Sequence, residues 1–337
     1  MIPHSNILIT GSTGFLGSRL LERILESDFS AKIIGAGRSI KPHASFEDER
    51  LTYVLGDLSD SNYVERLFNE FPIDCVVNCA ALSSPWGKYD EFYQANVQSQ
   101  HELIKQAEAK SIRRYVHIST PSLYFDFQDK MNVKESDPLP INMPNYYAAT
   151  KLEADRLLQT SNLSWISLRP RALVGRGDTV IMPRVIRAAD EGRLRIIGDG
   201  NNHVDLTPVA NVVDAIILSI NAQESAAGEI YNIANGAPVS LWPILQATLA
   251  KLGRELPQKK IPLGLVMNIA RLMEFYSRNL GGYKEPSLTA YGVGTIAYSF
   301  SLDIAKAKEK LGYSPRLSVE EAIDEFVDWY KAQQDES

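Results

Sequence analysis

Cysteine is scarce in this sequence: only two occur among 337 residues, and both, Cys75 and Cys79, lie in one apolar run at 73–82. A cysteine-based metal site or a redox pair would need more ligands or a CxxC spacing, and the sequence has neither. We therefore expect both thiols to belong to the core, and we expect no metal site.

Positive charge is also in deficit. The chain carries 35 basic and 41 acidic residues, for a net charge of −6, and it has no basic run of the length typical of nucleic-acid binding. We therefore expect no DNA or RNA partner. Residues 1–5 lack the basic region and the long apolar core of a secretory signal, which favours a cytoplasmic protein.

Apolar runs long enough to span a membrane are missing as well. The most hydrophobic late stretch, 261–275, has a proline near its start and is interrupted by Asn268, Arg271 and Glu274, so it is too short and too polar to cross a bilayer. We interpret it as an amphipathic helix, part of an apolar lid over 261–280 that covers a substrate pocket. Contact with a membrane surface is the alternative, although more lysine and arginine would be typical of it.

The first half of the chain does contain a regular alternation of strand-like and helix-like segments. Strands are expected near 5–10, 31–36, 51–55, 73–80, 112–119 and 164–169, and helices near 15–27, 60–70, 90–110 and 147–160. This rhythm predicts an α/β fold, a doubly wound parallel sheet of the Rossmann type that binds its ligand at the carboxyl ends of the strands.

The alternation becomes less regular after Pro170. We therefore assign residues 1–173 to a dinucleotide-binding domain and residues 174–332 mainly to a smaller substrate-binding region. A strand-like segment near 229–234 is expected to return to the first sheet. The second region would then be interleaved with the first and would not form a separate body.

A glycine-rich motif at the start of the chain indicates what the sheet binds. The apolar strand at 5–10 runs into Gly11, Gly14 and Gly17, and a helix-like pattern follows directly. Gly11 permits a tight turn with positive φ, Gly14 lets the backbone approach a pyrophosphate, and Gly17 allows the helix to pack closely on the strand. Strand, turn and helix together predict a dinucleotide site at a helix N-terminus.

A tyrosine and a lysine four residues apart, Tyr147 and Lys151, open the helical pattern at 147–160, so both side chains lie on one helix face. A nearby ammonium and a cationic nicotinamide ring would lower the pKa of the phenol from about 10 toward neutrality. Tyr147 could then exchange a proton with a carbonyl or alcohol oxygen. Thr120, at the end of an earlier strand, could hold that oxygen beside it.

The order of these motifs resembles that of the extended short-chain dehydrogenases/reductases. The resemblance is carried by the glycine motif at 10–17, Gly56-Asp57-Leu58, Asn78-Cys79-Ala80-Ala81, Asn96, Ser119-Thr120, Tyr147 to Lys151, and Leu168-Arg169-Pro170. It implies that Asp57 contacts the adenine, that Tyr147 is the acid–base residue, that Lys151 holds the nicotinamide ribose and that Thr120 orients the substrate. Asn96 and Pro170 would shape the nicotinamide site, with structural turns as the alternative.

The predicted site consists of a catalytic and a cofactor-binding set that overlap. The catalytic residues are Thr120, Tyr147 and Lys151. The cofactor-binding residues are Gly11, Ser12, Thr13, Gly14, Phe15, Leu16, Gly17, Arg38, Asp57, Leu58, Cys79, Ala80, Ala81, Asn96, Ser119, Tyr147, Lys151 and Pro170.

The end of the second strand bears on the choice of nicotinamide cofactor. An acidic residue there is typical of NAD sites, whereas an arginine accommodates the 2′-phosphate of NADP. The segment from Ala31 to Phe46 has no acid, and Arg38 follows the strand. We therefore predict NADP with Arg38 as the phosphate ligand, keeping NAD, with Arg38 a solvated surface side chain, as the alternative.

The sequence departs from the sugar-nucleotide members of this family in two places. Family dehydratases carry Asp-Glu after the threonine, whereas this chain has Pro121-Ser122, and the arginine that holds a sugar diphosphate is replaced by Val204 before Asp205. The segments 198–207, 285–289 and 300–307 are similar to those of the 3β-hydroxysteroid dehydrogenase and 2-alkyl-3-oxoalkanoate reductase branch.

The main hypothesis is therefore NADP-linked interconversion of a ketone and a secondary alcohol on a hydrophobic small molecule that is lipid-like, steroid-like or polyketide-like. A sugar-nucleotide epimerase is the second hypothesis, and a non-catalytic NADP-sensing protein is the third. Similarity to relatives also implies a homodimer formed through two helices that cover the sheet.

Overall fold

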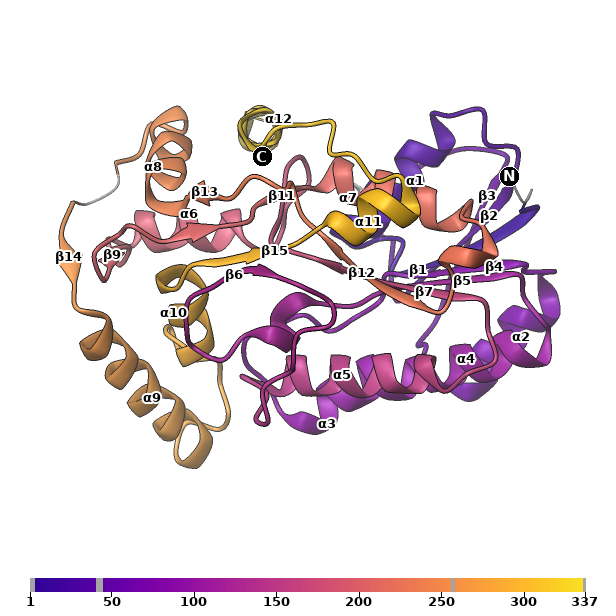
Figure 1. The fold of residues 1–337 in the computed structure, drawn as a ribbon, viewed down its shortest axis with the longest axis horizontal. Helices are drawn as coiled ribbons and strands as arrows, with labels where there is room; N and C mark the ends of the chain where they lie inside the picture. Colours follow the sequence, from indigo (N-terminus) through magenta and orange to yellow (C-terminus); the bar gives the residue numbers. More distant parts are fainter. Residues whose placement is uncertain (1–3, 41–44, 256–257, 336–337) are drawn as a thin grey trace.

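A seven-stranded, fully parallel sheet forms the centre of the molecule. The computed structural model describes residues 4–40, 45–255 and 258–335 (Figure 1). The strands follow the order β12-β7-β5-β4-β1-β2-β3. Their bounds are β1 (Asn6–Thr10), β2 (Lys32–Gly37), β3 (Leu51–Leu55), β4 (Cys75–Asn78), β5 (Arg114–Ile118), β7 (Trp165–Pro170) and β12 (Glu229–Ile233). The doubly wound Rossmann-type fold predicted from the sequence is confirmed.

Helices cover both faces of this sheet, and the strands are accordingly apolar on both sides. Ile7 and Ile9 of β1 point into the cluster beneath α1 and α7, whereas Leu8 points into the opposite cluster beneath α2 and α4. The first face carries α1 (Phe15–Leu25), α7 (Val209–Ile220) and α11 (Ala305–Leu311). The second carries α2 (Ser61–Glu70), α4 (Ser99–Ala109) and α5 (Tyr146–Gln159).

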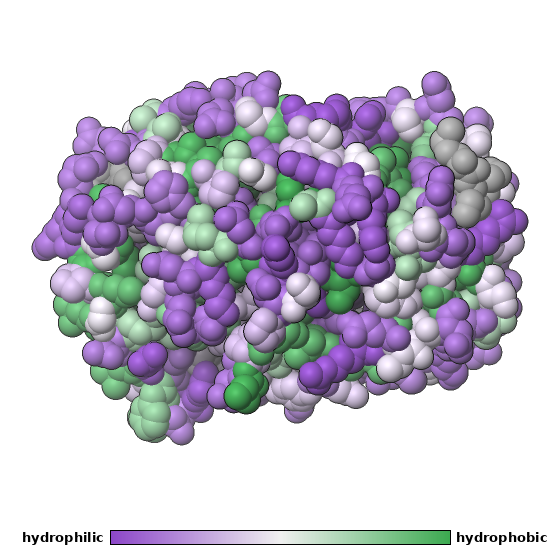
Figure 2. Space-filling view, viewed as in Figure 1, coloured by the Kyte–Doolittle hydropathy of each residue, from purple (hydrophilic) through white to green (hydrophobic). Residues whose placement is uncertain are grey.

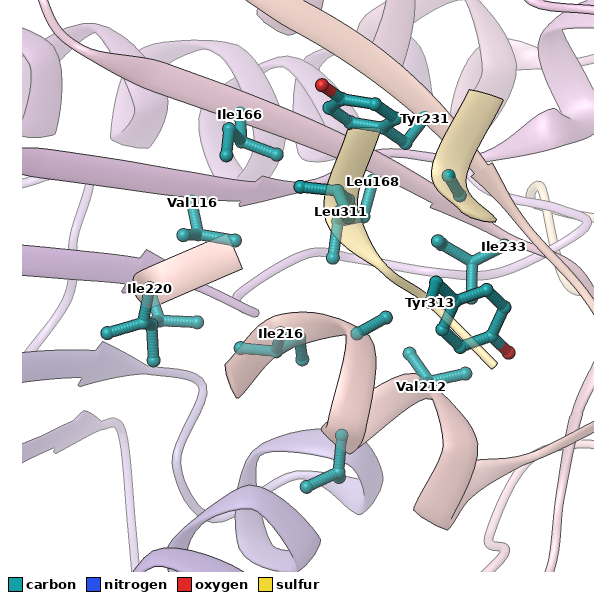
Figure 3. Close-up of a cluster of buried hydrophobic side chains, with 14 of the residues drawn as sticks. Val116, Ile166, Leu168, Val212, Ile216, Ile220, Tyr231, Ile233, Leu311 and Tyr313 are labelled. Carbon is teal, nitrogen blue, oxygen red and sulfur yellow. The ribbon is translucent and has the colours of Figure 1, made fainter. Parts of the chain in front are cut away.

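The largest apolar cluster joins segments that are far apart in the sequence. Figure 3 shows Val116 and Leu168 of the sheet facing Val212 and Ile216 of α7, with Leu311 of α11 closing the cluster. All five side chains are fully or almost fully buried. At roughly 1.5–3 kcal/mol for each large apolar side chain removed from water, such contacts fix β12 and the C-terminal helices on the nucleotide-binding sheet.

The long helix expected at 90–110 is interrupted, which corrects the sequence-based prediction. It consists of α3 (Tyr89–Phe92), a π-helical segment η2 (Tyr93–Gln98) and α4. The side chain of Asn96, within the π-helical segment, binds Leu82 N at 2.8 Å, Leu82 O at 3.2 Å and Thr150 Oγ1 at 3.1 Å. These long-range contacts hold the wider turn, and hydrophobic periodicity carries no signal for them.

Smaller elements, most of them from the later part of the chain, lie beside the carboxyl edge of the main sheet. A second sheet has the order β13-β10-β15-β6, and two further strand pairs are β8 with β11 and β9 with β14. Their bounds are β6 (Lys130–Val133), β8 (Leu173–Val174), β9 (Ile196–Ile197), β10 (His203–Val204), β11 (Thr207–Pro208), β13 (Val239–Ser240), β14 (Lys260–Ile261) and β15 (Phe300–Leu302). The remaining helices are α6 (Met182–Asp190), α8 (Leu241–Lys251), α9 (Leu263–Asn279), α10 (Ala290–Ala297) and α12 (Val319–Asp335), with short turns η3 (Pro121–Tyr124) and η4 (Glu224–Ala226).

The two halves of the chain exchange strands. β12, from the second half, pairs with β7, while β6, from the first half, pairs with β15 near the C-terminus. A division at residue 173 stays a prediction, and its ranges include residues 1–3, 41–44 and 256–257, which lie outside the described residues.

Helix α9 forms where the amphipathic lid was expected, and it buries Val266, Met267 and Ala270 in the core while other apolar side chains stay exposed. Its exposed large side chains are Leu265, Ile269, Leu272, Phe275 and Tyr276. Figure 2 shows hydrophobic side chains at the lower left, where Figure 1 places this helix. Glu274 and Arg278 of this helix line the neighbouring cavity, so the helix lies against a pocket as expected, and its role as a lid over substrate stays a prediction. Within the described ranges no helix is long and apolar enough to cross a membrane.

Candidate active site

The glycine-rich loop between β1 and α1 leaves space for nothing larger than hydrogen at two of its positions. Gly11 has a φ of +63°, and a Cβ on it would lie 2.8 Å from Ala80 N. A Cβ on Gly17 would lie 2.2 Å from Gly11 O, so α1 packs directly on the turn. This cradle at a helix N-terminus fits the diphosphate of a dinucleotide, whose negative charge the free N–H groups would stabilise.

Other residues of the predicted glycine segment have contacts of their own. The Ser12 hydroxyl donates to Ala36 O of β2 at 3.2 Å and is fully buried. Thr13 is buried beside Gly37, and Phe15 and Leu16 begin α1. These contacts hold the loop against the end of β2, where Arg38 emerges.

Arg38 and Asp57 lie near each other at the carboxyl ends of β2 and β3. Arg38 is exposed, and its charge acts on the Asp57 carboxylate. The pKa of Asp57 is lowered, first by the backbone N–H of Ser59, which donates at 2.9 Å, then by the Ser59 hydroxyl, and further by Arg38. Leu58, the next predicted residue, is buried.

The segment after β4 runs directly past the glycine loop. Ala80 N donates to Thr10 Oγ1 at 3.3 Å and to Asn78 Oδ1 at 3.2 Å, which brings Cys79, Ala80 and Ala81 to this edge. Cys75 is a fully buried core thiol, as expected, whereas Cys79 is only partly buried beyond the end of the strand. Burial raises the pKa of the Cys79 thiol to about 12, so it stays protonated at neutral pH.

Tyr147 and Thr120 meet as the sequence predicts. The Tyr147 hydroxyl forms hydrogen bonds with the side chains of Thr120 and Ser83, and these bonds lower its pKa. Burial acts in the opposite direction and is the larger effect, so the pKa of Tyr147 is raised overall. Thr120 is itself held by Ser122, whose backbone N–H donates to Thr120 Oγ1 at 3.2 Å.

Lys151 points from the same helix into the sheet. Its Nζ donates to Ile118 O at 2.6 Å and to His117 Nε2 at 3.0 Å, and the side chain is almost fully buried. Burial lowers the pKa of Lys151 to about 8, against the opposing charge of Asp155. Burial and the nearby cations also hold the pKa of His117 well below its usual value, so the imidazole stays neutral and accepts a hydrogen bond from the Lys151 ammonium.

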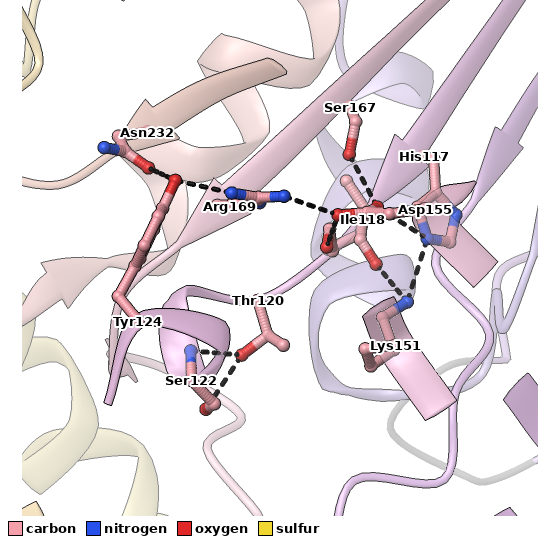
Figure 4. A network of polar contacts seen from close by, with 11 residues as sticks. His117, Ile118, Thr120, Ser122, Tyr124, Lys151, Asp155, Ser167, Arg169 and Asn232 are labelled. Atoms are coloured by element: carbon pink, nitrogen blue, oxygen red, sulfur yellow. Dashed lines mark hydrogen bonds and ion pairs between the residues drawn. The ribbon is translucent and has the colours of Figure 1, made fainter. Parts of the chain in front are cut away.

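A network of buried polar side chains, centred on Asp155, lies next to Lys151 (Figure 4). Asp155 accepts hydrogen bonds from Ser119 at 2.8 Å, from Ser167 at 3.1 Å and from Arg169 Nη2 at 2.8 Å. Arg169 Nη1 also donates to Tyr124 OH at 2.5 Å. Ser119 was predicted to bind the cofactor, but in this structure its hydroxyl donates its hydrogen bond to Asp155.

Sequence reasoning missed His117, Asp155 and Arg169 as partners of the catalytic helix. Asp155 carried a usable signal, because it lies one helical turn after Lys151 on the same face. His117 had a weaker one, because the two-residue alternation of β5 places it on the same face as Ser119. Pro170 ends β7 beside Ile233, at the edge where Arg38 and Thr120 also lie.

A cavity of about 380 Å³ lies against α5 and α10. Its wall is formed by Pro85, Trp86, Gly87, Phe92, Ile141, Asn142, Met143, Pro144, Asn145, Tyr146, Ala149, Glu274, Arg278, Tyr283, Ala290 and Tyr291. Tyr291 OH hydrogen-bonds Ser122 Oγ at 2.6 Å, and Ser122 Oγ accepts from Thr120 Oγ1 at 3.0 Å. This chain of hydroxyls connects the cavity to Tyr147.

A family model places this arrangement among known proteins. The model described as "NAD dependent epimerase/dehydratase family" matches residues 7–234, which include the glycine loop, Thr120, Tyr147 and Lys151. The chain belongs to this family. It is an NAD(P)-dependent dehydrogenase/reductase of the extended short-chain type.

Individual relatives of this family extend the similarity over the whole chain. "3beta-hydroxysteroid-dehydrogenase/decarboxylase isoform 1" of Arabidopsis thaliana is 32% identical over 95% of this chain and 78% of its own length. "2-alkyl-3-oxoalkanoate reductase" of Stenotrophomonas maltophilia is 31% identical over 94% and 97%. The crystal structure of UDP-glucuronic acid 4-epimerase from Bacillus cereus in complex with NAD shares the fold, with a TM-score of 0.73 and 21% identity over 97% of this chain and 99% of that one.

Proposed function

We propose that this chain is an NADP(H)-dependent oxidoreductase that interconverts a ketone and a secondary alcohol on a hydrophobic, lipid-like, steroid-like or polyketide-like molecule. The observation that carries the proposal is the cavity that the hydroxyls of Tyr291, Ser122 and Thr120 connect to Tyr147. Only Glu274 and Arg278 of its lining residues are charged, and aromatic and aliphatic side chains form much of the rest. A cavity of this composition suits a ligand with an apolar skeleton that also carries polar groups.

The proposed roles follow from the contacts of each side chain. Tyr147 exchanges a proton with the substrate oxygen, and Thr120 and Ser83 hold that oxygen and the phenol together. Lys151 contributes positive charge beneath the site and would bind the ribose next to the reacting ring. When bound, the nicotinamide cofactor supplies or accepts the hydride. The glycine loop, Asp57 and the segment Cys79 to Ala81 would hold its adenosine diphosphate half.

The names of the relatives support a ketone or alcohol as the reacting group. A hydroxysteroid dehydrogenase and an oxoalkanoate reductase both act on a carbon that carries an alcohol or carbonyl oxygen beside an apolar skeleton. Family dehydratases carry Asp-Glu after the threonine, whereas this chain has Pro121-Ser122, so it has no carboxylate at that position to catalyse the elimination of water. A homodimer through two sheet-covering helices stays a prediction from the resemblance.

The alternative function is that of a sugar-nucleotide epimerase, because a UDP-sugar epimerase has the same fold. A panel of candidate ligands distinguishes the two functions. With NADPH present, we expect oxidation of the cofactor by hydrophobic ketones such as 2-decanone, steroid ketones or 3-oxo acids. UDP- and dTDP-sugars should neither raise the melting temperature nor be epimerised. Tight binding of a sugar nucleotide, together with inert ketones, would overturn the proposal.

Arg38 is expected to decide the cofactor preference. In Arg38→Ala, the KM for NADPH should rise about tenfold to hundredfold, because a charge-assisted bond to the 2′-phosphate is lost, while the KM for NADH should change little. Initial rates with both cofactors measure the effect. Lys32→Ala, an exposed cation at the other end of β2, is the control and should leave both KM values unchanged. Equal changes for NADPH and NADH in Arg38→Ala would contradict the assignment.

A further inference from the structure

The buried ammonium of Lys151 depends on one neighbouring side chain for its position. Lys151 is 1% exposed, and its Nζ donates to Ile118 O at 2.6 Å and to His117 Nε2 at 3.0 Å (Figure 4). Among the residues that the structure describes, no carboxylate lies within 4.0 Å of this nitrogen, and the nearby Asp155 pairs with Arg169 instead. Ile118 contributes a backbone carbonyl, which any residue there would supply. His117 is therefore the side chain that fixes the ammonium.

His117 is a costly residue to bury if its role is only structural. It is 1% exposed, in a strand that also sends Tyr115 and Val116 into the core, and its Nδ1 is buried without a partner in the described part of the chain. An unpaired buried polar atom costs about 1–3 kcal/mol, so an apolar side chain would suit the core better. Asp155 Oδ1 lies 3.8 Å from Nε2, too far for a hydrogen bond. The bond from Lys151 is thus the polar contact that the imidazole makes.

An imidazole at this place orients the ammonium without neutralising it. Arg169 is paired with the Asp155 carboxylate at 2.8 Å, whereas both acceptors of Lys151 are uncharged. Burial and the charges of Lys151 and Arg169 hold the pKa of His117 well below its usual value, so the ring stays neutral. An ammonium has three N–H donors, and Ile118 and His117 accept from two of them. One donor and the full charge remain for a ligand at the carboxyl end of β5.

We propose that His117 is a positioning residue that acts through Lys151, holding the ammonium so that its third N–H binds the nicotinamide ribose of the cofactor. The inference rests on the proposed function, in which Lys151 binds that ribose. Because the acceptor is neutral, the bond from Lys151 to the ribose stays charge-assisted, which makes it about twice as strong as a bond between neutral groups. Without the imidazole, the ammonium would lose the side chain that directs it.

Binding of cofactor in the absence of any ketone tests this role. The fluorescence of NADPH or NADH, whichever binds more tightly, gives its Kd for each variant. In His117→Leu the Kd at pH 7 should rise about tenfold to hundredfold, because a charge-assisted bond is lost. His117→Gln should retain most of the affinity, since its amide oxygen is another neutral acceptor. His101→Leu, which changes an exposed histidine on α4, is the control and should leave the Kd unchanged.

The pH dependence of this Kd separates positioning from damage to the fold. Burial lowers the pKa of Lys151 to about 8, while the charges of Asp155 and Cys79 oppose this effect. The wild type should therefore bind cofactor less tightly above about pH 8, where the ammonium loses its proton. His117→Leu removes an acceptor that stabilises the ammonium, so the pKa of Lys151 falls further and the loss of affinity should begin at a lower pH. A misfolded fraction would reduce the number of binding sites without moving this pH.

The cofactor-free protein tests the contact itself. If Nε2 accepts from Lys151, the ring proton of His117 is on Nδ1, and ¹⁵N NMR of histidine-labelled protein should show a neutral Nδ1–H tautomer that is absent from His117→Gln. A charged ring or an Nε2–H tautomer at pH 7, an unchanged Kd and pH dependence in His117→Leu, or a Gln variant as weak as Leu would overturn the inference and leave ketone reduction intact. If no ketone or secondary alcohol reacts with the wild type, the proposed function fails, whatever the binding data show.

Discussion

Replacing Tyr147 by phenylalanine is expected to reduce kcat for ketone reduction by about 100-fold to 10,000-fold, the typical contribution of a positioned acid–base group. The phenol is the group that hydrogen-bonds both Thr120 and Ser83, and phenylalanine keeps its ring without the proton. Steady-state rates with NADPH and a reactive ketone from the panel measure the loss.

Binding of the cofactor provides the control for this variant. NADPH should still raise the melting temperature of Tyr147→Phe, because the glycine loop, Asp57 and Lys151 are unchanged and the phenol is only one of the predicted cofactor contacts. Tyr330→Phe, on α12 and remote from the site, should keep wild-type kcat. A Tyr147→Phe enzyme with undiminished kcat would show that proton transfer occurs elsewhere.

Loss of one member of the Asp155–Arg169 pair is expected to cost about 3–5 kcal/mol of unfolding free energy, because the remaining charge stays buried without its partner. Asp155 is 1% and Arg169 3% exposed, and both also bond to neighbouring side chains. Urea unfolding of Asp155→Leu, of Arg169→Met and of the double variant measures the cost.

The double variant separates the pair from simple loss of packing. Replacing both charges by apolar side chains removes the uncompensated ion, so the double variant should lose clearly less than the sum of the two single variants. Additive losses, or single losses below about 1 kcal/mol, would contradict the view that this network holds the Lys151 end of the site.

Those parts of the architecture that depend on local pattern were predictable. The strands of the main sheet are short apolar runs between helical periods, and the run at 73–82 gave β4 in the middle of the sheet. The glycine motif and the Tyr147–Lys151 spacing were also recognisable, because each requires particular residues at fixed separations. Thr120 could be placed beside Tyr147 because the carboxyl ends of parallel strands share one edge.

What could not be predicted depends on contacts between distant segments. Tyr291 and Ser83 reach the site from loops or helices without a motif. The π-helical turn exists because Asn96 bonds to Leu82 and Thr150, and no periodic pattern records such bonds. Helix α9 was predicted as a helix, yet which of its apolar side chains are buried and which stay exposed depends on tertiary packing, which its own sequence does not specify.

Transfer of label from NADPH deuterated at C4 of the nicotinamide tests the central claim most directly. If this chain is a ketone reductase, mass spectrometry of the alcohol formed from a hydrophobic ketone should show one deuterium on the carbinol carbon, with wild-type enzyme and not with Tyr147→Phe. An alcohol that carries only solvent hydrogen at that carbon, or no alcohol from any ketone while UDP-sugars are epimerised, would contradict the account.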